Sequence, residues 1–215
     1  MLKLINASIV VLSEGNNPKL LNHDFLSRNF IVPEDWELQN VVVTPPYALL
    51  DYKNGLQFLV EVHKLHIKLN RPDLFAWDSD LPRMAVSYLE LLPHVNYQGV
   101  GINLVYALDP APKKTLFGLV HEGPWLKEWG GISGASLELN YRHQQPQLNL
   151  KIGVPSKDSE ENKTFQPTLS ANFHHDFAPQ DEQQRREYIL SAPDLAQRLE
   201  DFAGELPLNL QETGS

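Results

Sequence analysis

An α+β fold is predicted for this chain, and three features of its sequence predict it. The pair Asn54-Gly55 separates two apolar segments, and such a pair can adopt both positive φ angles of a type I′ turn, which indicates a β-hairpin. An apolar stripe at helical spacing begins at Leu81. Strand-like segments at 2–12 and 97–108 flank these two elements. The predicted order is strand, helix, strand, strand, helix, strand.

The first strand is expected at 2–12, where β-branched residues are frequent and a polar loop follows. A helix is expected at 18–29. Asn17 is a favourable N-cap, Pro18 suits the first helical position, and apolar side chains then recur at helical spacing. The three valines at 41–43 indicate a return to extended backbone before the hairpin.

The segment 56–69 is expected to be one long strand, although its apolar positions change phase. The first set has even numbers and the second has odd numbers: Leu56, Phe58, Val60 and Val62, then Leu65, Ile67 and Leu69. Side chains alternate between the two faces of a strand, so a regular strand would carry its apolar side chains across the sheet. A β-bulge near His63-Lys64 would restore the register. Alternatively, the strand leaves one apolar surface and enters another.

A second helix is expected at 81–92, with Asp80 or Ser79 as its N-cap, because the apolar stripe there is the most regular in the chain. A strand at 97–108 follows. Over residues 2–108 this order of elements is that of the ferredoxin-like β-α-β-β-α-β motif. The sequence therefore predicts a ferredoxin-like N-terminal half.

The second half is expected to repeat part of this pattern. The sequence Asp-Pro-Ala-Pro at 109–112 is typical of a linker between domains. Beyond it, 135–141 and 147–154 alternate apolar and polar residues and predict a second hairpin, and a strand is expected at 165–177.

Helical residues at 181–204 are expected to divide near Pro193, with Ser191 as the second N-cap. A short helix at 113–121 completes a helix–hairpin–helix order like that of the first half. We therefore expect a related α+β second half, as in a pseudo-repeat, whose sheet either joins the first sheet or forms a layer of its own. The expected division is 1–109, 113–208 and a tail at 209–215.

Composition excludes several classes of protein. With 42% apolar and 21% charged residues the chain is typical of a soluble globular protein, and no segment is long and apolar enough to predict a membrane span. The formal net charge of −9 opposes binding to phosphate backbones, and the densest basic clusters are the pairs Lys113-Lys114 and Arg185-Arg186. There is no cysteine, which excludes disulfides and thiolate chemistry. A cytoplasmic location without a nucleic-acid or membrane partner is expected.

Histidines beside carboxylates are the main candidates for chemistry. Glu61 and His63 share one strand face, as do His174 and Asp176, with His175 between the latter two. Two such pairs side by side would form an imidazole–carboxylate metal site without thiolate, or a His–Asp acid/base pair. The alternative is that these are ordinary polar residues on solvated strand faces.

Two tryptophans, Trp125 and Trp129, lie in a segment that is expected to be a loop. Large aromatic surfaces in a loop can anchor a partner or stack on a sugar ring. The alternative is that both indoles close one end of the core, since tryptophan is buried in most proteins. No dinucleotide loop, nucleophile elbow or phosphate loop is complete, so no cofactor is expected.

The sequence favours a non-catalytic binding or protein-interaction module that associates with another protein or with itself, for example by pairing of sheet edges. Two alternatives stay open. One is a metal-assisted hydrolase or acid/base enzyme that uses the His/Glu/Asp cluster. The other is a regulatory protein that binds a small molecule in a cleft between the halves, where ligands are often held.

Overall fold

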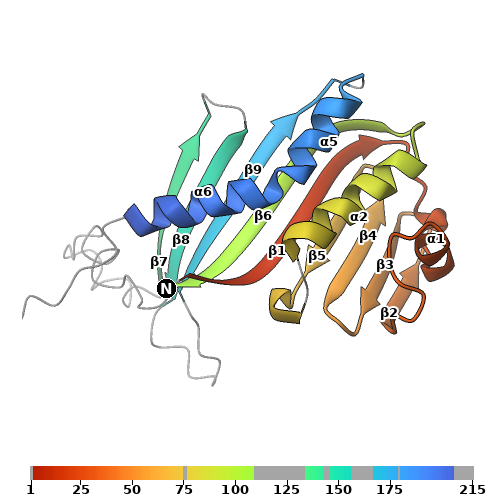
Figure 1. The fold of residues 1–215 in the computed structure, drawn as a ribbon, viewed down its shortest axis with the longest axis horizontal. Coiled ribbons are helices and arrows are strands. Elements are labelled where there is room, and N and C mark those ends of the chain that lie inside the picture. The colour runs from red at the N-terminus through yellow and green to blue at the C-terminus, as the bar shows by residue number, and fades with distance from the viewer. Residues whose placement is uncertain are drawn as a thin grey trace, which may run out of the picture.

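The computed structural model describes residues 2–74, 77–108, 134–142, 146–155, 167–178 and 180–205. Its centre is one nine-stranded sheet with the spatial order β2-β3-β4-β5-β1-β6-β9-β8-β7 (Figure 1). Each strand is antiparallel to its neighbours. The strands are β1 (Leu2–Glu14), β2 (Leu38–Val43), β3 (Tyr47–Tyr52), β4 (Leu56–Glu61), β5 (Lys64–Leu69), β6 (Asn96–Leu108), β7 (Gly134–Tyr141), β8 (Gln147–Pro155) and β9 (Thr168–Asp176).

The prediction of a ferredoxin-like first half is wrong. Four strands, β2 to β5, lie between the first two helices, where that motif has two. β5 and β6 both pair antiparallel with β1, one on each side of it, and the helix between them carries the chain across β1. The sheet of the second half joins the first sheet, one of the two expected arrangements, because β9 pairs with β6. The expected pseudo-repeat is wrong for the described residues, because β7, β8 and β9 precede the two C-terminal helices, whereas four strands lie between the first two helices. The linker expected at 109–112 lies outside the described residues.

The segment 56–69 is itself a hairpin and not one long strand. It contains neither the expected β-bulge nor a strand that passes from one apolar surface to another. β4 ends at Glu61 and β5 begins at Lys64, and these two residues are partners across the turn. Residues separated by a two-residue turn pair with opposite parity, so Val60 and Leu65 lie opposite each other on the same buried face. The turn therefore explains the change of phase in the apolar pattern.

The hairpin at Asn54-Gly55 is confirmed, but its turn is not of type I′. Gly55 has a φ of +89°, whereas Asn54 does not have a positive φ. The N–H of Gly55 donates to the carbonyl of Tyr52 at 2.9 Å, and the side chain of Asn54 accepts from the N–H of Leu56 at 3.1 Å. This is the pattern of a longer hairpin loop in which only the last residue requires glycine.

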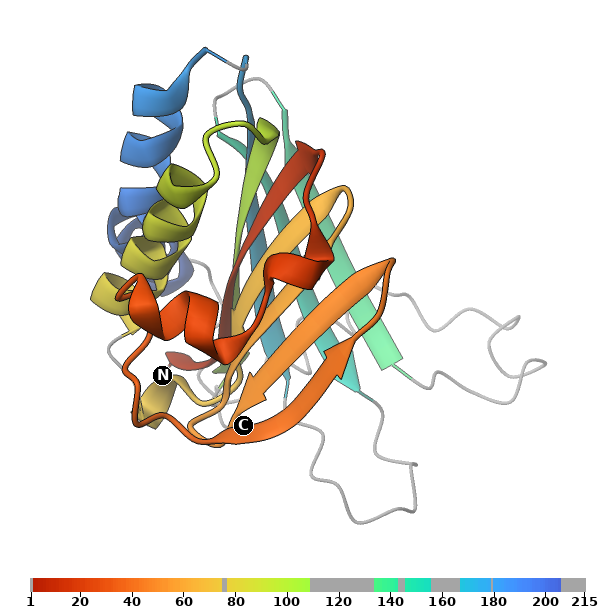
Figure 2. The same ribbon diagram turned by 90° about the vertical axis from the view of Figure 1, so that its right-hand side faces the viewer.

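The α-helices of the described residues are α1 (His23–Arg28), α2 (Trp77–Leu91), α5 (Glu182–Leu190) and α6 (Ala192–Glu205). All four lie on one face of the sheet (Figure 2). α2 is the predicted second helix, although it begins earlier and contains Ser79 and Asp80. The helical C-terminal region divides at Ser191, close to Pro193 as predicted. Ser191 was also predicted to cap the second helix, but its hydroxyl donates to the carbonyl of Tyr188, in the preceding helix α5, at 2.8 Å.

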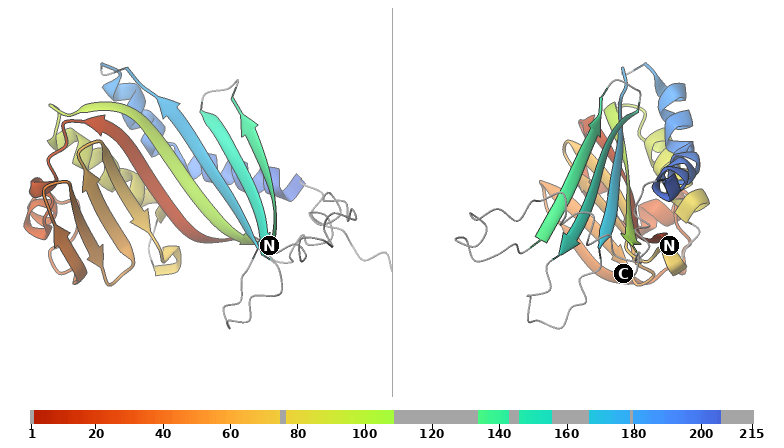
Figure 3. Two further views of the ribbon diagram at one scale, coloured as in Figure 1. Left: turned by 180° about the vertical axis from the view of Figure 1, so that it is seen from behind. Right: turned by 90° about the vertical axis from the view of Figure 1, so that its left-hand side faces the viewer.

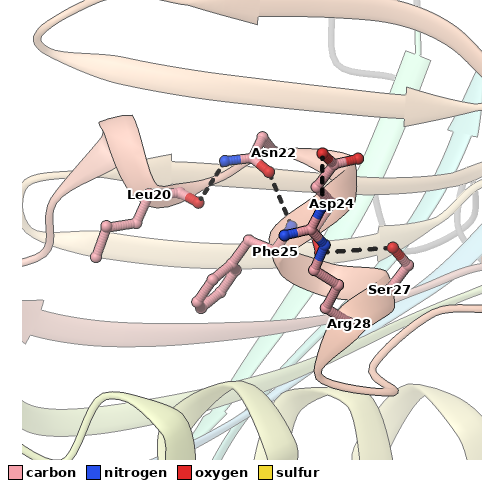
Figure 4. A network of polar contacts seen from close by, with 6 residues as sticks. All are labelled: Leu20, Asn22, Asp24, Phe25, Ser27 and Arg28. Carbon is pink, nitrogen blue, oxygen red and sulfur yellow. Dashed lines mark hydrogen bonds and ion pairs between the residues drawn. The ribbon is translucent and has the colours of Figure 1, made fainter.

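The helix expected at 18–29 is in fact a 3₁₀ turn at Pro18–Leu20 followed by the short helix α1. A new helix begins after the 3₁₀ turn because Asn22 caps α1. The Asn22 side chain accepts a hydrogen bond from the N–H of Phe25 at 2.8 Å (Figure 4). The Asn22 amide also donates to the carbonyl of Leu20 at 3.2 Å. The two caps, Asn17 and Asn22, thus split one expected helix into two short elements.

The core lies between the helices and one face of the sheet. Roughly every second residue of β1, β3, β4, β5, β6 and β9 is buried on this face of the sheet. α2, α5 and α6 pack apolar side chains against these residues. No helix of the described part of the chain lies over the other face (Figure 3), which we call the open face. Among the described residues, no helix combines the length and the apolar character that a membrane crossing requires.

Candidate functional site

A row of polar side chains crosses the open face at right angles to the strands. The row follows from the register of all eight strand pairings and consists of Asn40, Asp51, Gln57, Lys68, Ser8, Asn103, Asn172, Asn149 and Asn140. We call it the polar row. It joins all nine strands, one residue from each, and every member is polar.

Hydrogen bonds link the middle of the polar row. The Asn149 amide donates to Asn172 Oδ1 at 3.5 Å, the Asn172 amide to Asn103 Oδ1 at 2.7 Å, and the Asn103 amide to Ser8 Oγ at 3.3 Å. Such cross-strand pairs hold neighbouring strands in register. The sequence did not single out these residues, because their alignment depends on the pairing of β6 with β9.

The expected pair His174–Asp176 is formed on the open face, with 2.8 Å between Nε2 and Oδ1. It lies opposite Gly99 and Gly101 of β6. A Cβ at Gly99 would lie 3.2 Å from Asp176 Oδ1 and 3.3 Å from His174 Cε1, so the missing side chain leaves the room that this pair occupies. The pair has the contact needed for proton transfer between an imidazole and a carboxylate, but no side chain of another described residue forms a hydrogen bond with either member.

Glu61 and His63 do not join this pair. Glu61 lies at the end of β4 in an ion pair with Lys64 at 3.1 Å, and His63 lies in the β4–β5 turn. Three strands separate β4 from β9, which places Glu61 about 19 Å from Asp176, or four inter-strand spacings. Within the described residues, no group of three or more histidine or acidic side chains could hold a metal ion.

His175 points to the opposite face from His174 and lies half-buried against the core. Its ring stacks on Phe177 with centroids 4.2 Å apart and lies 5.2 Å from the ring of Tyr188. Burial lowers the pKa of His175 below its ordinary value, because the charged imidazolium is poorly solvated there. The role of His175 in this structure is therefore packing, on the side of the sheet away from His174.

His66 is a polar group in an apolar part of the open face. Its neighbours across β4 and β1 are Leu59 and Val10, and the next residue along the same row is Leu49. Its Nε2 atom is buried and has no hydrogen-bond partner among the described residues. Burial, and after it the charges of Lys64 and Lys68, lower the pKa of His66, so the neutral form is favoured.

The basic pair Arg185-Arg186 is divided between the core and the surface. Arg185 is 5% exposed, donates from Nη1 to the carbonyl of Tyr97 at 3.1 Å, and lies 5.3 Å from the centroid of the Tyr97 ring. Arg186 forms an ion pair with Glu90 of α2 at 3.2 Å. Both residues thus fasten α5, one to β6 and the other to α2, and neither contributes to a basic surface.

Strand β2 lies at one end of the described sheet and has β3 as its one neighbour among the described strands. Its six residues carry no charge, and Val41 and Val43 are 49% and 50% exposed. A bulge between Leu38 and Asn40 leaves Asn40–Val43 as the regular part of this edge. Natural sheets usually protect an edge with charged residues or proline, so an uncharged valine edge is a candidate for strand pairing.

Trp125 and Trp129, the other candidates for binding, lie outside the described residues. No protein-family model matches the chain, and no curated protein shows significant sequence similarity to it. The candidate sites therefore stand on the geometry of this chain alone.

Proposed function

We propose that the protein is a non-catalytic interaction module that forms a homodimer by pairing β2 with β2 of a second copy. The observation that carries this proposal is the uncharged, half-exposed valine edge Asn40–Val43 at the end of the sheet. The opposite edge strand, β7, is less suited to self-pairing because it carries Glu138, which would bring like charges close together in a two-fold pairing.

The hydrogen bonds of β2 indicate which of its backbone groups are free to pair. The N–H of Thr44 donates to the carbonyl of Tyr47 at 2.9 Å, so residue 44 bonds toward β3. In an antiparallel strand the bonding direction alternates, so Val42 also bonds toward β3, while Val41 and Val43 present their N–H and C=O groups to the outside.

A two-fold axis through Val42 brings these groups together without a change of register. Val41 then lies opposite Val43 of the second copy, and Val43 lies opposite its Val41. Each of these two pairs can form two backbone hydrogen bonds. Because both copies present the same edge, the contact is self-complementary, as a C2 interface must be. This self-complementarity favours a second copy over an unrelated partner.

The expected dimer is weak. About four hydrogen bonds contribute about 0.5–1.5 kcal/mol each, and the half-exposed valines contribute apolar burial. Association costs about 4–15 kcal/mol in lost translational and rotational freedom. A dissociation constant on the order of 100 µM is consistent with this balance.

The variant Val41→Pro tests the proposal. Proline removes one outward N–H and is tolerated where an edge-strand N–H faces solvent, so the monomer should fold. Val41→Thr is the matched control, because it keeps the N–H and a β-branched side chain. The assay is analytical sedimentation from about 10 to 500 µM, a span that includes the expected dissociation constant. The wild type and the threonine variant should form more dimer as their concentration rises, and the proline variant should stay monomeric.

Amide hydrogen exchange locates the interface at the same time. Exchange at Val41 and Val43 should slow as the protein concentration rises, whereas the N–H of Val42 is already bonded to β3 and should change little. A wild type that stays monomeric over this range would refute the proposal. A dimer that forms without protection of Val41 and Val43 would refute it as well.

A further inference from the structure

A groove separates α6 from the part of the sheet formed by β7, β8 and β9, on the helix side. Its volume is about 230 Å³, and it is lined by Tyr141, Pro146, Leu148, Phe173, Leu195, Arg198, Leu199 and Phe202. Figure 1 shows α6 crossing over these strands toward the far edge of the sheet. The groove is independent of the β2 edge, which lies at the other end of the sheet.

The floor and the wall of the groove come from regular elements. Tyr141, Leu148 and Phe173 are partners in register across β7, β8 and β9, so they form one row of the sheet. Leu195 and Leu199 are one helical turn apart on α6 and face this row. Because the side chains sit on strands and a helix, the shape of the groove is set by the backbone.

Among the described residues that line the groove, Arg198 is the one that carries a charge, and it is the only basic residue of α6. No ion pair joins it to another described residue, and Asp201, the acid one turn further along, accepts a hydrogen bond from Gln197 at 2.9 Å. The groove thus combines an apolar floor with a single cation at its wall. A ligand that fits both needs an apolar body and one anionic group.

We propose that this groove binds a small amphipathic carboxylate, with its hydrocarbon part on the row Tyr141–Leu148–Phe173 and its carboxylate on the Arg198 guanidinium. The volume is larger than the cavity of about 150 Å³ that holds benzene in an engineered protein and smaller than the sites of about 300 Å³ or more that hold drug-sized ligands. A medium-length acyl chain lies in this range. An arginine also matches the two oxygens of a carboxylate.

Calorimetric titration with octanoate tests the proposal, with 1-octanol and butyrate as comparison ligands. Octanoate should bind one to one with an affinity in the millimolar to sub-millimolar range, as expected for so few atoms. Each methylene between butyrate and octanoate should tighten binding about fourfold, because burying one methylene has an effect of that size. Octanol should bind more weakly than octanoate, because it offers no charge to Arg198.

Two charge variants separate the groove from general electrostatics. Arg198→Gln should weaken octanoate about tenfold and leave octanol unchanged, whereas Arg28→Gln removes the same charge from the exposed surface of α1 and should change neither. Binding that is not saturable, or equal binding to the wild type and Arg198→Gln, would overturn the proposal. Val41→Pro should leave octanoate binding unaltered, so this proposal can fail without the dimer failing.

Discussion

Replacing Gly55 with alanine tests how the turn between β3 and β4 is held, and the chain contains a matched control at Gly15. The two glycines have φ values of +89° and +90°. A Cβ at Gly55 would lie 2.9 Å from Cβ of Arg71, 3.0 Å from its Cγ and 3.3 Å from its backbone nitrogen. A Cβ at Gly15 would have no atom within 4 Å.

The difference between the two variants isolates the steric effect of Arg71. Both substitutions carry the strain of a positive φ, about 1–2 kcal/mol, and both restrict the unfolded chain by a similar amount. Only Gly55→Ala also adds an atom to filled space, which costs about 1–3 kcal/mol. The free energy of unfolding should therefore fall by about 1–3 kcal/mol more in Gly55→Ala than in Gly15→Ala. Each kcal/mol corresponds to about 2–4 °C in Tm for a chain of this size.

Urea-induced unfolding at pH 7.5, followed by circular dichroism, measures both variants against the wild type. If both variants lose the same stability, the contact between the turn and Arg71 does not constrain the turn, and the steric reasoning is refuted. A smaller loss in Gly55→Ala would refute it more strongly, because nothing surrounds the added atom at Gly15.

The remaining predictions concern a hydrogen bond between α5 and β9 and the pH dependence caused by His66 and His175. Tyr188→Phe keeps the ring but removes the hydroxyl that donates to the carbonyl of Phe173 at 2.9 Å, so urea unfolding should show a loss of about 1 kcal/mol; unchanged stability would contradict this. Burial lowers the pKa of both His66 and His175 in the folded protein. As the pH falls, these two histidines are therefore protonated in the unfolded chain at a higher pH than in the folded one. Stability should be constant above about pH 7 and fall as the pH drops through the ordinary histidine value near 6.5. Combining His66→Gln with His175→Phe should flatten this dependence between about pH 5.5 and 7.5, and an unaltered slope would exclude these two groups as its source.

The positions of individual elements followed well from the sequence. Strands predicted at 2–12, 97–108 and 165–177 are present, because alternation of apolar side chains is a property of a single strand. The helix at 81–92 is present because its apolar stripe matches the helical period over several turns.

The order of the strands in the sheet could not be predicted from the sequence, and the segment 56–69 shows why. A two-residue turn and a β-bulge produce the same change of parity, and Val62-His63 contains no glycine, asparagine or proline that would indicate a turn. Two strands were missed between the first two helices: 56–69 is two strands and not one, and the extended residues 41–43, which were not counted as a strand, belong to β2. The ferredoxin-like prediction rested on that count.

The candidate sites depended on pairings that the sequence does not display. The contact between His174 and Asp176 could be expected, because both residues lie on one face of one strand. The separation of this pair from Glu61 follows from the three strands that lie between β4 and β9. The polar row and the groove also require the register between strands that are distant in sequence.

Local periodicity, turns and caps by themselves determined where most strands and helices lie, since each depends on residues a few positions apart. The tertiary structure alone decided which strands are neighbours, which face the helices cover and which edge is left free. The reason is that these arrangements minimise exposed apolar area over the whole chain. One strand pattern can satisfy that requirement with several partners, and only the assembled sheet selects among them.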